Sequence, residues 1–312
     1  MTILLTGAFK YTDEQINKLK SLGLHVLFVE DERTNLQIDC TDIDGVVCNN
    51  LFLYNDISNF KNLRFIQLTS AGTDRVPLDH IKEKNIILKN ARGVYSIPMA
   101  EYTVLKILEI YKKSRFFYKM QETRTWQKQR NLLELYDKTA AIIGFGSDGI
   151  EIAKRLKCFG VKIIAVDVRN FCEAELEMTD EVRSIDNIDD VLLESDIVIL
   201  TVPLNEHTYK LMNRHRLSKM KDNSVLINIA RGGIIDEAAL IDAIEKGKFL
   251  GVALDVFEHE PLSMDSPLWC FDNVIITPHN SFVSDKVKNR LFELIVENLS
   301  QFLKLQHKDV CK

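Results

Sequence analysis

No hydrophobic run in the sequence approaches the roughly 20 residues that a bilayer-spanning helix needs, so we expect no membrane partner. An excess of positive charge is also missing, since 40 Lys and Arg residues stand against 45 Asp and Glu residues, for a net charge of −5. Nucleic-acid-binding domains usually carry a basic face, and this balance therefore argues against a nucleic-acid partner. It does not argue against a small anionic substrate, because the local pocket sets the field that such a molecule meets.

Paired cysteine spacing is absent as well. The six cysteines are scattered and show none of the close pairs typical of zinc sites: Cys40, Cys48, Cys158, Cys172, Cys270 and Cys311. The first seven residues lack the basic start and the long apolar stretch of a signal peptide. We therefore expect a cytoplasmic protein with reduced thiols and no metal ion.

Short runs of Val, Ile and Leu alternate with helical patterns along the 312 residues. Such runs are typical of strands buried on both faces of a parallel sheet, and the alternation predicts an α/β fold. The length favours two domains. Strands are predicted in two series, at Ile3–Thr6, His25–Val29, Gly45–Cys48, Arg64–Leu68 and Ile86–Leu88, and then at Thr139–Ile143, Val161–Val166, Ile197–Leu200, Ser224–Ile229, Leu250–Leu254 and Val274–Ile276.

A long helix separates the two series. Ser96 is suited to cap it, and Pro98 falls in its first turn, where a missing N–H costs little. A final helix is predicted from about Val283 to Leu303, with an apolar stripe along one face. Because this helix follows the last strand of the second series, we expect it to return to the first domain.

A glycine motif follows the predicted strand Thr139–Ile143. Gly144, Gly146 and Gly149 have the GxGxxG spacing that opens a dinucleotide-binding helix. The first allows a tight turn, the second lets the backbone approach a pyrophosphate, and the third lets helix and strand pack closely. The helix N-terminus then presents free N–H groups to the anion. On this helix we expect Ile152, Leu156 and Phe159 to share one side.

Asp167 ends the next strand, at about the spacing expected for the acid that binds the adenosine ribose. Its charge would also repel the 2′-phosphate of NADP, so NAD is the expected cofactor. Two neighbours complicate this interpretation. Asp148 places a carboxylate inside the phosphate loop, so we expect its side chain to point away. Arg169 follows closely and could soften the preference for NAD.

Three later strands are each followed by a residue that can bind an anion or transfer a proton: Arg231, Glu260 and His279. Ligands of open α/β sheets bind beyond the carboxyl ends of the strands, so these side chains could converge. A guanidinium grips a carboxylate and a neighbouring keto oxygen in a fork. Hydride transfer to the keto carbon leaves an alkoxide, which His279 could protonate near neutral pH. Glu260 would stabilise the protonated imidazole. Each residue alone has a structural explanation, and the interpretation depends on the three together.

Taken in order, these segments resemble the NAD-dependent D-2-hydroxyacid dehydrogenase family along nearly the whole chain. The matching stretches are Ser70–Asp74, Asn90–Val94, Gly144–Gly149, Asn228–Asp236, Gly251–Pro261 and Asn273–His279. The resemblance implies two doubly wound parallel-sheet domains. Residues 1–96 and 283–312 would form a flavodoxin-like substrate domain, and residues 97–282 an inserted Rossmann-like NAD-binding domain.

The resemblance also implies functional residues. Arg231, Glu260 and His279 would be catalytic, and the backbone of Ala71 and Gly72 would bind the substrate carboxylate together with Arg231 and His279. Asp255 would lie near the nicotinamide amide. Further cofactor contacts would come from Thr103, Phe145, Ser147, Asp148, Ile150, Val202, Pro203, Thr208 and Ala230, besides the glycines and Asp167.

The stretch from Trp126 to Tyr136 resembles the dimerisation segment of the family, which implies a homodimer. The chain departs from the family at Asp148, where an apolar residue is usual, and at Ser70, where many members have glycine. The segment Asn280–Phe282 also lacks the glycine-containing run common in the family. These departures affect the expected shape of the nicotinamide pocket, not the reaction class.

Two other functions compete with this interpretation. A binding protein that senses NAD, of the C-terminal binding protein type, would keep the same trio. A phosphoglycerate dehydrogenase should carry extra basic residues near its pocket, and the loop from Asn49 to Tyr54 has none. We therefore expect a non-phosphorylated 2-keto acid such as glyoxylate, hydroxypyruvate or a branched-chain keto acid.

Overall fold

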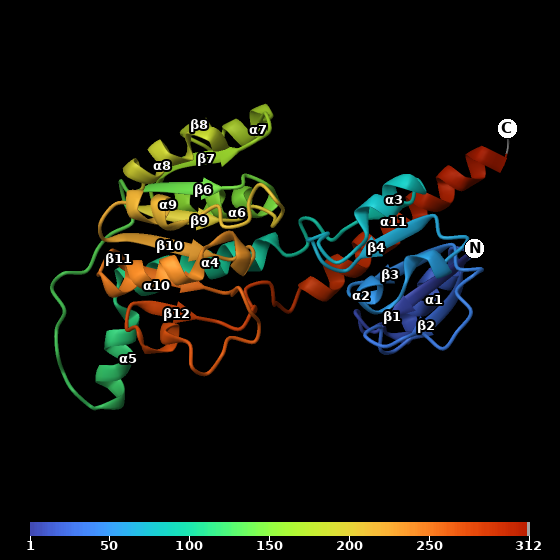
Figure 1. The fold of residues 1–312 in the computed structure, drawn as a ribbon, viewed down its shortest axis with the longest axis horizontal. Coiled ribbons are helices and arrows are strands. Elements are labelled where there is room, and N and C mark those ends of the chain that lie inside the picture. Colours follow the sequence, from blue (N-terminus) through green and yellow to red (C-terminus); the bar gives the residue numbers. More distant parts are fainter. Residues whose placement is uncertain (311–312) are drawn as a thin grey trace. The chain divides into compact units, whose positions relative to one another are not determined.

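The computed structural model describes residues 1–310, which divide into two compact units. The smaller unit combines Met1–Tyr95 with the segment from Ser284 onward, and the larger unit is Ser96–Val283. In Figure 1 the smaller unit is blue, cyan and red, and the larger one runs from green to orange. Each unit is described by itself below.

The smaller unit is built on a five-stranded parallel sheet with the order β2-β1-β3-β4-β5. Its strands are β1 (Thr2–Thr6), β2 (His25–Val29), β3 (Gly45–Cys48), β4 (Phe65–Leu68) and β5 (Ile87–Lys89). Its helices are α1 (Asp13–Ser21), α2 (Leu51–Tyr54), η1 (Ile57–Asn59), α3 (Leu78–Glu83) and α11 (Val287–Val310). The strand order reverses direction at β1, as in doubly wound folds.

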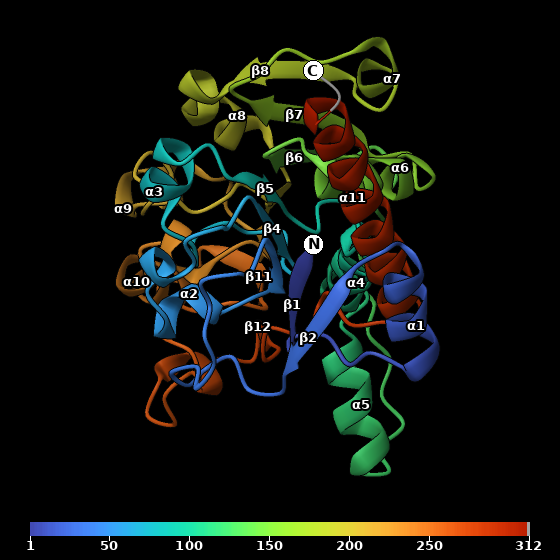
Figure 2. The ribbon, with the colours of Figure 1, turned by 90° about the vertical axis from the view of Figure 1, so that its right-hand side faces the viewer.

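Apolar residues of α1 and α11 cover one face of this sheet, and α2, η1 and α3 cover the other. Figure 2 shows α11 running beside α1. The ring of Phe65 on β4 stacks on Phe302 of α11, with 4.8 Å between ring centroids. α11 begins at Val287 and not at Val283, because Val283 and Lys286 belong to two turns that precede the helix.

The larger unit is built on a seven-stranded parallel sheet with the order β12-β11-β10-β9-β6-β7-β8. Its strands are β6 (Thr139–Ile143), β7 (Lys162–Asp167), β8 (Glu181–Ser184), β9 (Ile197–Leu200), β10 (Ser224–Asn228), β11 (Phe249–Leu254) and β12 (Val274–Ile276). β8 was not predicted from the sequence, because this short edge strand alternates half-buried and exposed residues instead of forming an apolar run.

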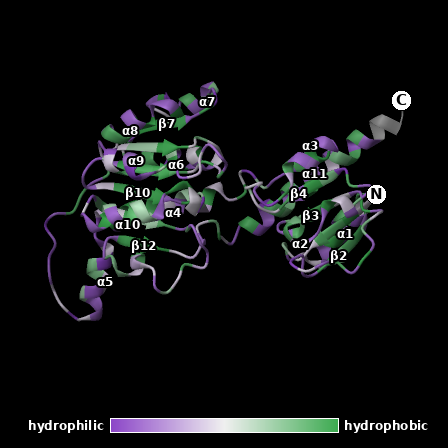
Figure 3. Cartoon of the chain, viewed as in Figure 1, coloured by the Kyte–Doolittle hydropathy of each residue, from purple (hydrophilic) through white to green (hydrophobic). Residues whose placement is uncertain are grey.

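Two layers of helices enclose this sheet. α4 (Ser96–Tyr111) and α6 (Ser147–Lys157) cover one face, and α8 (Ile188–Glu194), α9 (Arg214–Lys219) and α10 (Glu237–Glu245) cover the other. Figure 3 shows hydrophobic residues concentrated along the strands. The remaining elements are α5 (Ser114–Glu122), α7 (Glu173–Leu176), η2 (Ile185–Asn187), η3 (Gly232–Ile234) and η4 (Pro267–Cys270). Phe159, expected on α6, lies beyond its end and is exposed.

Candidate active site

The glycine turn between β6 and α6 has the backbone shape that a phosphate needs. Gly144 adopts a left-handed φ of 97°, and a Cβ there would lie 2.7 Å from the backbone nitrogen of Val202. A Cβ on Gly149 would lie 2.7 Å from the carbonyl oxygen of Gly144. Gly146 faces open space and precedes the first turn of α6, which no side chain caps. The N–H groups of that turn are therefore available to an anion.

Asp148 lies in the first turn of α6, where its carboxylate accepts a hydrogen bond from the hydroxyl of Ser96. Ser96 is the first residue of α4, so this carboxylate lies near a second helix N-terminus, which favours negative charge. The neighbouring Phe145 is fully buried and its ring contacts that of Phe171. The glycine turn is thus held by the hydrogen bond to Asp148 and by the ring contact of Phe145.

Asp167 ends β7 beside this turn. One of its carboxylate oxygens accepts a hydrogen bond of 2.9 Å from the backbone N–H of Phe145, and the other accepts one of 2.7 Å from Val168. Arg169 forms a two-pronged ion pair with Glu175 on α7, with both nitrogen–oxygen distances at 2.8 Å. Its Nε also lies 3.7 Å from the Asp167 carboxylate. Two carboxylates and one guanidinium therefore gather at the end of β7.

His279 and Glu260 are brought together beyond the ends of β11 and β12. The Nδ1 of His279 lies 2.8 Å from a carboxylate oxygen of Glu260. The other oxygen of Glu260 accepts a hydrogen bond of 3.1 Å from the backbone N–H of Phe257, which fixes the carboxylate. Because Nδ1–H donates to Glu260, the imidazole presents Nε2 on its opposite side. This is the arrangement of a histidine acid or base oriented by a carboxylate.

The turn that carries His279 is organised by Asp255, which is fully buried at the end of β11. One carboxylate oxygen accepts hydrogen bonds from the hydroxyl of Thr277 at 2.6 Å and the backbone N–H of Asn280 at 2.8 Å. The other accepts one from the N–H of Ser281 at 2.9 Å. The Asp255 carbonyl accepts the N–H of His279 itself, which has a left-handed φ of 49°. Asp255 thus holds the backbone on both sides of the histidine.

A second layer supports this turn. The hydroxyl of Thr277 uses its hydrogen toward Asp255, so the short hydrogen bond between Thr277 and Tyr102 has the Tyr102 hydroxyl as donor. Tyr102 comes from α4, and burial raises the pKa of its phenol well above the ordinary value. The phenol therefore remains a donor at physiological pH.

Arg231 follows β10 on the loop next to Glu260. The side chain of Asn228 pins this loop, since its amide donates to the carbonyl of Arg231 and its oxygen accepts the N–H of Ala230. A Cβ on Gly232 would lie 1.8 Å from the carbonyl carbon of Phe257, so the loops after β10 and β11 touch through their backbones. The guanidinium itself donates to the carbonyl of Ala230.

The other expected cofactor residues of the larger unit lie at the same edge of the sheet or on the helices beside it. Val202 and Pro203 follow β9, and the hydroxyl of Thr208 donates to the carbonyl of Pro203 at 2.6 Å. The hydroxyl of Thr103 donates within α4, to Met99. Ile150 packs against the core from α6.

Ala71 and Gly72 lie in the smaller unit, on the loop after β4. The side chain of Asn90 donates to the carbonyl of Ala71 at 2.7 Å, and the hydroxyl of Ser70 donates to the carbonyl of Gly72 at 3.0 Å. Ser70, which departs from the family pattern, therefore secures this loop.

Two functional features were not found from the sequence. The ion pair of Arg169 with Glu175 joins the loop after β7 to the short helix α7, and no sequence motif predicts it. The support of Asp255 by Thr277 and Tyr102 joins three separate elements. The single available signal was a run of polar residues around His279, which does not reveal its partners.

Among residues 1–306, whose side chains the structure describes, no group of three or more His, Cys, Asp or Glu side chains gathers as a ligand set for a metal ion. The same part of the chain contains no helix with the length and apolar character to cross a membrane.

The fold and this edge of the sheet define a class. A doubly wound parallel sheet with a glycine turn after its first strand, a carboxylate at the end of the second and a histidine–carboxylate pair is typical of a dinucleotide-dependent oxidoreductase. The model of the D-isomer specific 2-hydroxyacid dehydrogenase NAD-binding domain matches residues 104–281. The chain belongs to the D-isomer specific 2-hydroxyacid dehydrogenase family.

Relatives agree with this assignment. The glyoxylate reductase of Thermofilum pendens is 37% identical over 253 residues, which cover 78% of this chain and 73% of that protein. The D-3-phosphoglycerate dehydrogenase of Archaeoglobus fulgidus is 34% identical, and the match spans 78% of this chain but 46% of that enzyme. The crystal structure of Aquifex aeolicus D-lactate dehydrogenase with NAD and lactic acid superposes with a TM-score of 0.80 at 27% identity, covering 98% and 96% of the two chains.

Proposed function

We propose that this protein reduces a small, non-phosphorylated 2-keto acid to the D-2-hydroxy acid with NADH, or catalyses the reverse reaction. Glyoxylate, hydroxypyruvate and related keto acids are the proposed substrates. The observation that carries the proposal is the hydrogen-bonded pair of His279 and Glu260, next to the pinned loop of Arg231, in a unit with a glycine turn for a dinucleotide.

The residues present fit NAD. The open backbone at Gly146 and the uncapped first turn of α6, from Ser147 to Ile150, suit the pyrophosphate. Asp167 suits the ribose hydroxyls. Further contacts are proposed at the edge of the sheet, from Thr103, Val202, Pro203, Thr208, Ala230 and Asp255. When bound, the cofactor supplies or accepts the hydride.

The chemistry of the protein itself is positioning and proton transfer. Arg231 binds the substrate carboxylate and polarises the keto group, whose oxygen gains negative charge during reduction. His279 donates its Nε2 proton to that oxygen, and in the reverse direction accepts it. Glu260 accepts the Nδ1–H throughout and stabilises the imidazolium state. The backbone of Ala71 and Gly72 is proposed as a further contact of the carboxylate.

A non-phosphorylated substrate is supported by the segment after β3. This segment, Asn49–Tyr54, which forms α2 from Leu51 onward, carries no basic residue, and its side chains Leu53 and Tyr54 are exposed. A phosphate group generally requires Arg or Lys donors close by.

The direct test is oxidation of NADH and NADPH, followed by absorbance, against a panel of 2-keto acids. The panel contains glyoxylate, pyruvate, hydroxypyruvate, 2-ketoisocaproate, phenylpyruvate and 3-phosphohydroxypyruvate. We expect turnover of at least one of the first five and preference for NADH. Activity restricted to the phosphorylated acid would overturn the substrate class. Tight NADH binding with no turnover of any acid would favour a sensing role instead.

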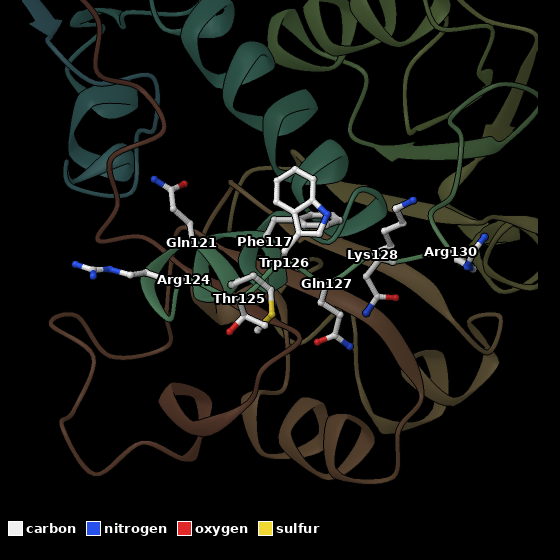
Figure 4. A pocket seen from close by; sticks show the side chains of 10 residues that line it. Phe117, Gln121, Arg124, Thr125, Trp126, Gln127, Lys128 and Arg130 are labelled. Atoms are coloured by element: carbon white, nitrogen blue, oxygen red, sulfur yellow. The ribbon is translucent and has the colours of Figure 1, made fainter.

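We also propose a homodimer formed through α5 and the irregular segment that follows it. α5 projects from the larger unit, and the segment then runs back along its side (Figure 1). Trp126 on this segment is 96% exposed, and Phe117 and Tyr118 on α5 are exposed as well. Phe117 and Trp126 line the same cavity, of about 880 Å³ (Figure 4). So much exposed aromatic surface is typical of an interface, and a second copy would cover it.

Sedimentation of the intact chain tests the dimer. We expect the Trp126→Ala variant to shift toward monomer at micromolar concentration. Trp269→Ala, at the only other tryptophan of the sequence, serves as the matched control and should leave the dimer intact. A wild-type chain that sediments as a monomer at all concentrations would refute the interface.

A cytoplasmic location is part of the proposal. The five cysteines within the described residues are all unpaired, as is usual in a reducing compartment. Cys311 lies outside the described residues. Cell fractionation with activity assays would check the location, and recovery outside the cytoplasm would contradict it.

A further inference from the structure

Three charged side chains gather at the end of β7, next to the glycine turn. Arg169 lies between two carboxylates, with Glu175 at 2.8 Å and Asp167 at 3.7 Å. Its guanidinium also donates to the carbonyl of Phe145 and lies over the ring of Phe171, 4.9 Å from the centroid. These contacts together fix the position of the guanidinium.

An arginine at this position could instead bind a phosphate group. Guanidinium groups bind phosphate through two parallel hydrogen bonds, and NADP differs from NAD by a phosphate on the ribose that Asp167 is proposed to bind. Here both terminal nitrogens of Arg169 already donate to the two oxygens of Glu175. The fork that would hold a 2′-phosphate is occupied by a carboxylate of the same chain.

The ion pair is stable over the physiological pH range. The hydrogen bond from Arg169, followed by that from the backbone N–H of Cys172, lowers the pKa of the Glu175 carboxyl to about 2. Glu175 also caps α7 through the Cys172 N–H, at 3.0 Å. The carboxylate is thus held from two directions and is charged wherever the enzyme would work.

We propose that Glu175 is a specificity-determining residue, which enforces the preference for NAD by holding Arg169 away from the 2′-phosphate of NADP. The inference rests on the proposed function, since it assumes that the dinucleotide binds at this turn. With Glu175 present, the three side chains carry a net charge of −1 and repel the phosphate. Without it, the net charge is zero, and each terminal nitrogen of the guanidinium regains one N–H for a phosphate while the bonds to the carbonyls of Phe145 and Asn170 remain.

The test is the dissociation constant of NADPH and of NADH, measured by fluorescence titration of the intact protein without substrate. Glu175→Gln removes the charge but keeps an oxygen that can accept the Cys172 N–H, so the cap of α7 is preserved. Glu173→Gln is the matched control, because it removes the same charge from an exposed position on the same helix. The thermal midpoint of each variant reports whether the unit remains folded.

We expect Glu175→Gln to bind NADPH about tenfold more tightly than the wild type, which corresponds to about 1.4 kcal/mol. NADH binding should change less than about twofold, and Glu173→Gln should change NADPH binding by less than about threefold, because surface charge effects are weak. In the double variant Arg169→Ala/Glu175→Gln, the gain for NADPH should disappear.

Two results would overturn the inference while leaving the proposed function intact. One is a change in Glu175→Gln no larger than that in Glu173→Gln. The other is a gain for NADPH that survives removal of Arg169, since the gain would then come from net charge alone. A wild-type chain that binds neither dinucleotide would instead refute the cofactor site itself, and the inference with it.

Discussion

Replacing Asp255 by asparagine is the sharpest test of how the His279 turn is held. The carboxylate is fully buried and accepts three hydrogen bonds, from the Thr277 hydroxyl and from the backbone N–H groups of Asn280 and Ser281. An asparagine has one oxygen, so its NH₂ group must face one of these donors. In the more favourable orientation, the asparagine oxygen keeps the hydrogen bonds from the Thr277 hydroxyl and the Asn280 N–H. The Ser281 N–H is then left without an acceptor.

The magnitude follows from these contacts. A hydrogen bond to a charged group contributes about 1.5–3 kcal/mol, and an unsatisfied buried donor costs about 1–3 kcal/mol, with overlap between the two. We therefore expect a loss of about 2–4 kcal/mol in the free energy of unfolding of the larger unit. At about 2–4 °C per kcal/mol, the thermal midpoint should fall by about 4–16 °C.

The assay is thermal unfolding followed by circular dichroism, with kcat measured in parallel. Because the Asn280 and Ser281 amides directly follow His279, their release would shift the imidazole, which should also lower kcat, by up to about 10²-fold for a 1 Å shift. Asp265→Asn makes the same chemical change at an exposed position and should behave as the wild type. A midpoint for Asp255→Asn within 1–2 °C of the wild type, roughly the range expected of a surface change, would refute the reasoning.

Four other outcomes are expected. Arg231→Lys should lower kcat/KM by about 10²-fold or more, because lysine cannot form the fork, and near-full activity would contradict the assigned role. His279→Asn should lower the rate by about 10²–10⁴-fold while NADH affinity, measured by titration, is kept; an unchanged rate would move the proton donor elsewhere. Gly232→Ala should destabilise the larger unit by about 3 kcal/mol or more in thermal unfolding, since its Cβ would lie 1.8 Å from the Phe257 carbonyl carbon, and an unchanged thermal midpoint would contradict this close approach. The folded-state pKa of Glu175 lies near 2 against an ordinary 4.5, so its contribution to stability is complete above about pH 4.5 and is lost as pH falls toward 2. The difference in thermal midpoint between wild type and Glu175→Gln should shrink over that window, and a constant difference from pH 7 to pH 3 would count against the ion pair.

Most of the architecture could be predicted from hydrophobic runs, because parallel strands buried on both faces are nearly continuous in Val, Ile and Leu. The predicted α/β fold with two parallel sheets is confirmed, and strands such as Gly45–Cys48 and Ile197–Leu200 have the predicted bounds. β8 was missed because this edge strand is half exposed and has Val182 as its single apolar residue. The start of α11 was placed too early, because hydrophobic periodicity does not distinguish turns from the first helical turn.

Some residues of the candidate site could likewise be predicted from the sequence, and others could not. The glycine turn and the residues Arg231, Glu260 and His279 could be proposed because each lies in a segment that follows a strand, and parallel strands end at one edge. The partners of Arg169 and Asp255 could not be found, because those contacts depend on distances across loops that no periodicity sets. The roles of these residues stay predictions until the variants above are measured.

The smaller unit is assembled from two distant parts of the chain, and this affects how the protein folds during synthesis. The sheet face that includes Ile3, Leu5 and Phe65 is covered largely by α11, which follows the whole larger unit in sequence. A ribosome adding about 5–20 residues per second needs about 10–40 s to make the roughly 190 residues in between. During that interval the larger unit can complete its own sheet, whereas the first sheet waits with an apolar face uncovered. Association with other nascent chains competes with folding in this window, and the arrival of α11 closes it.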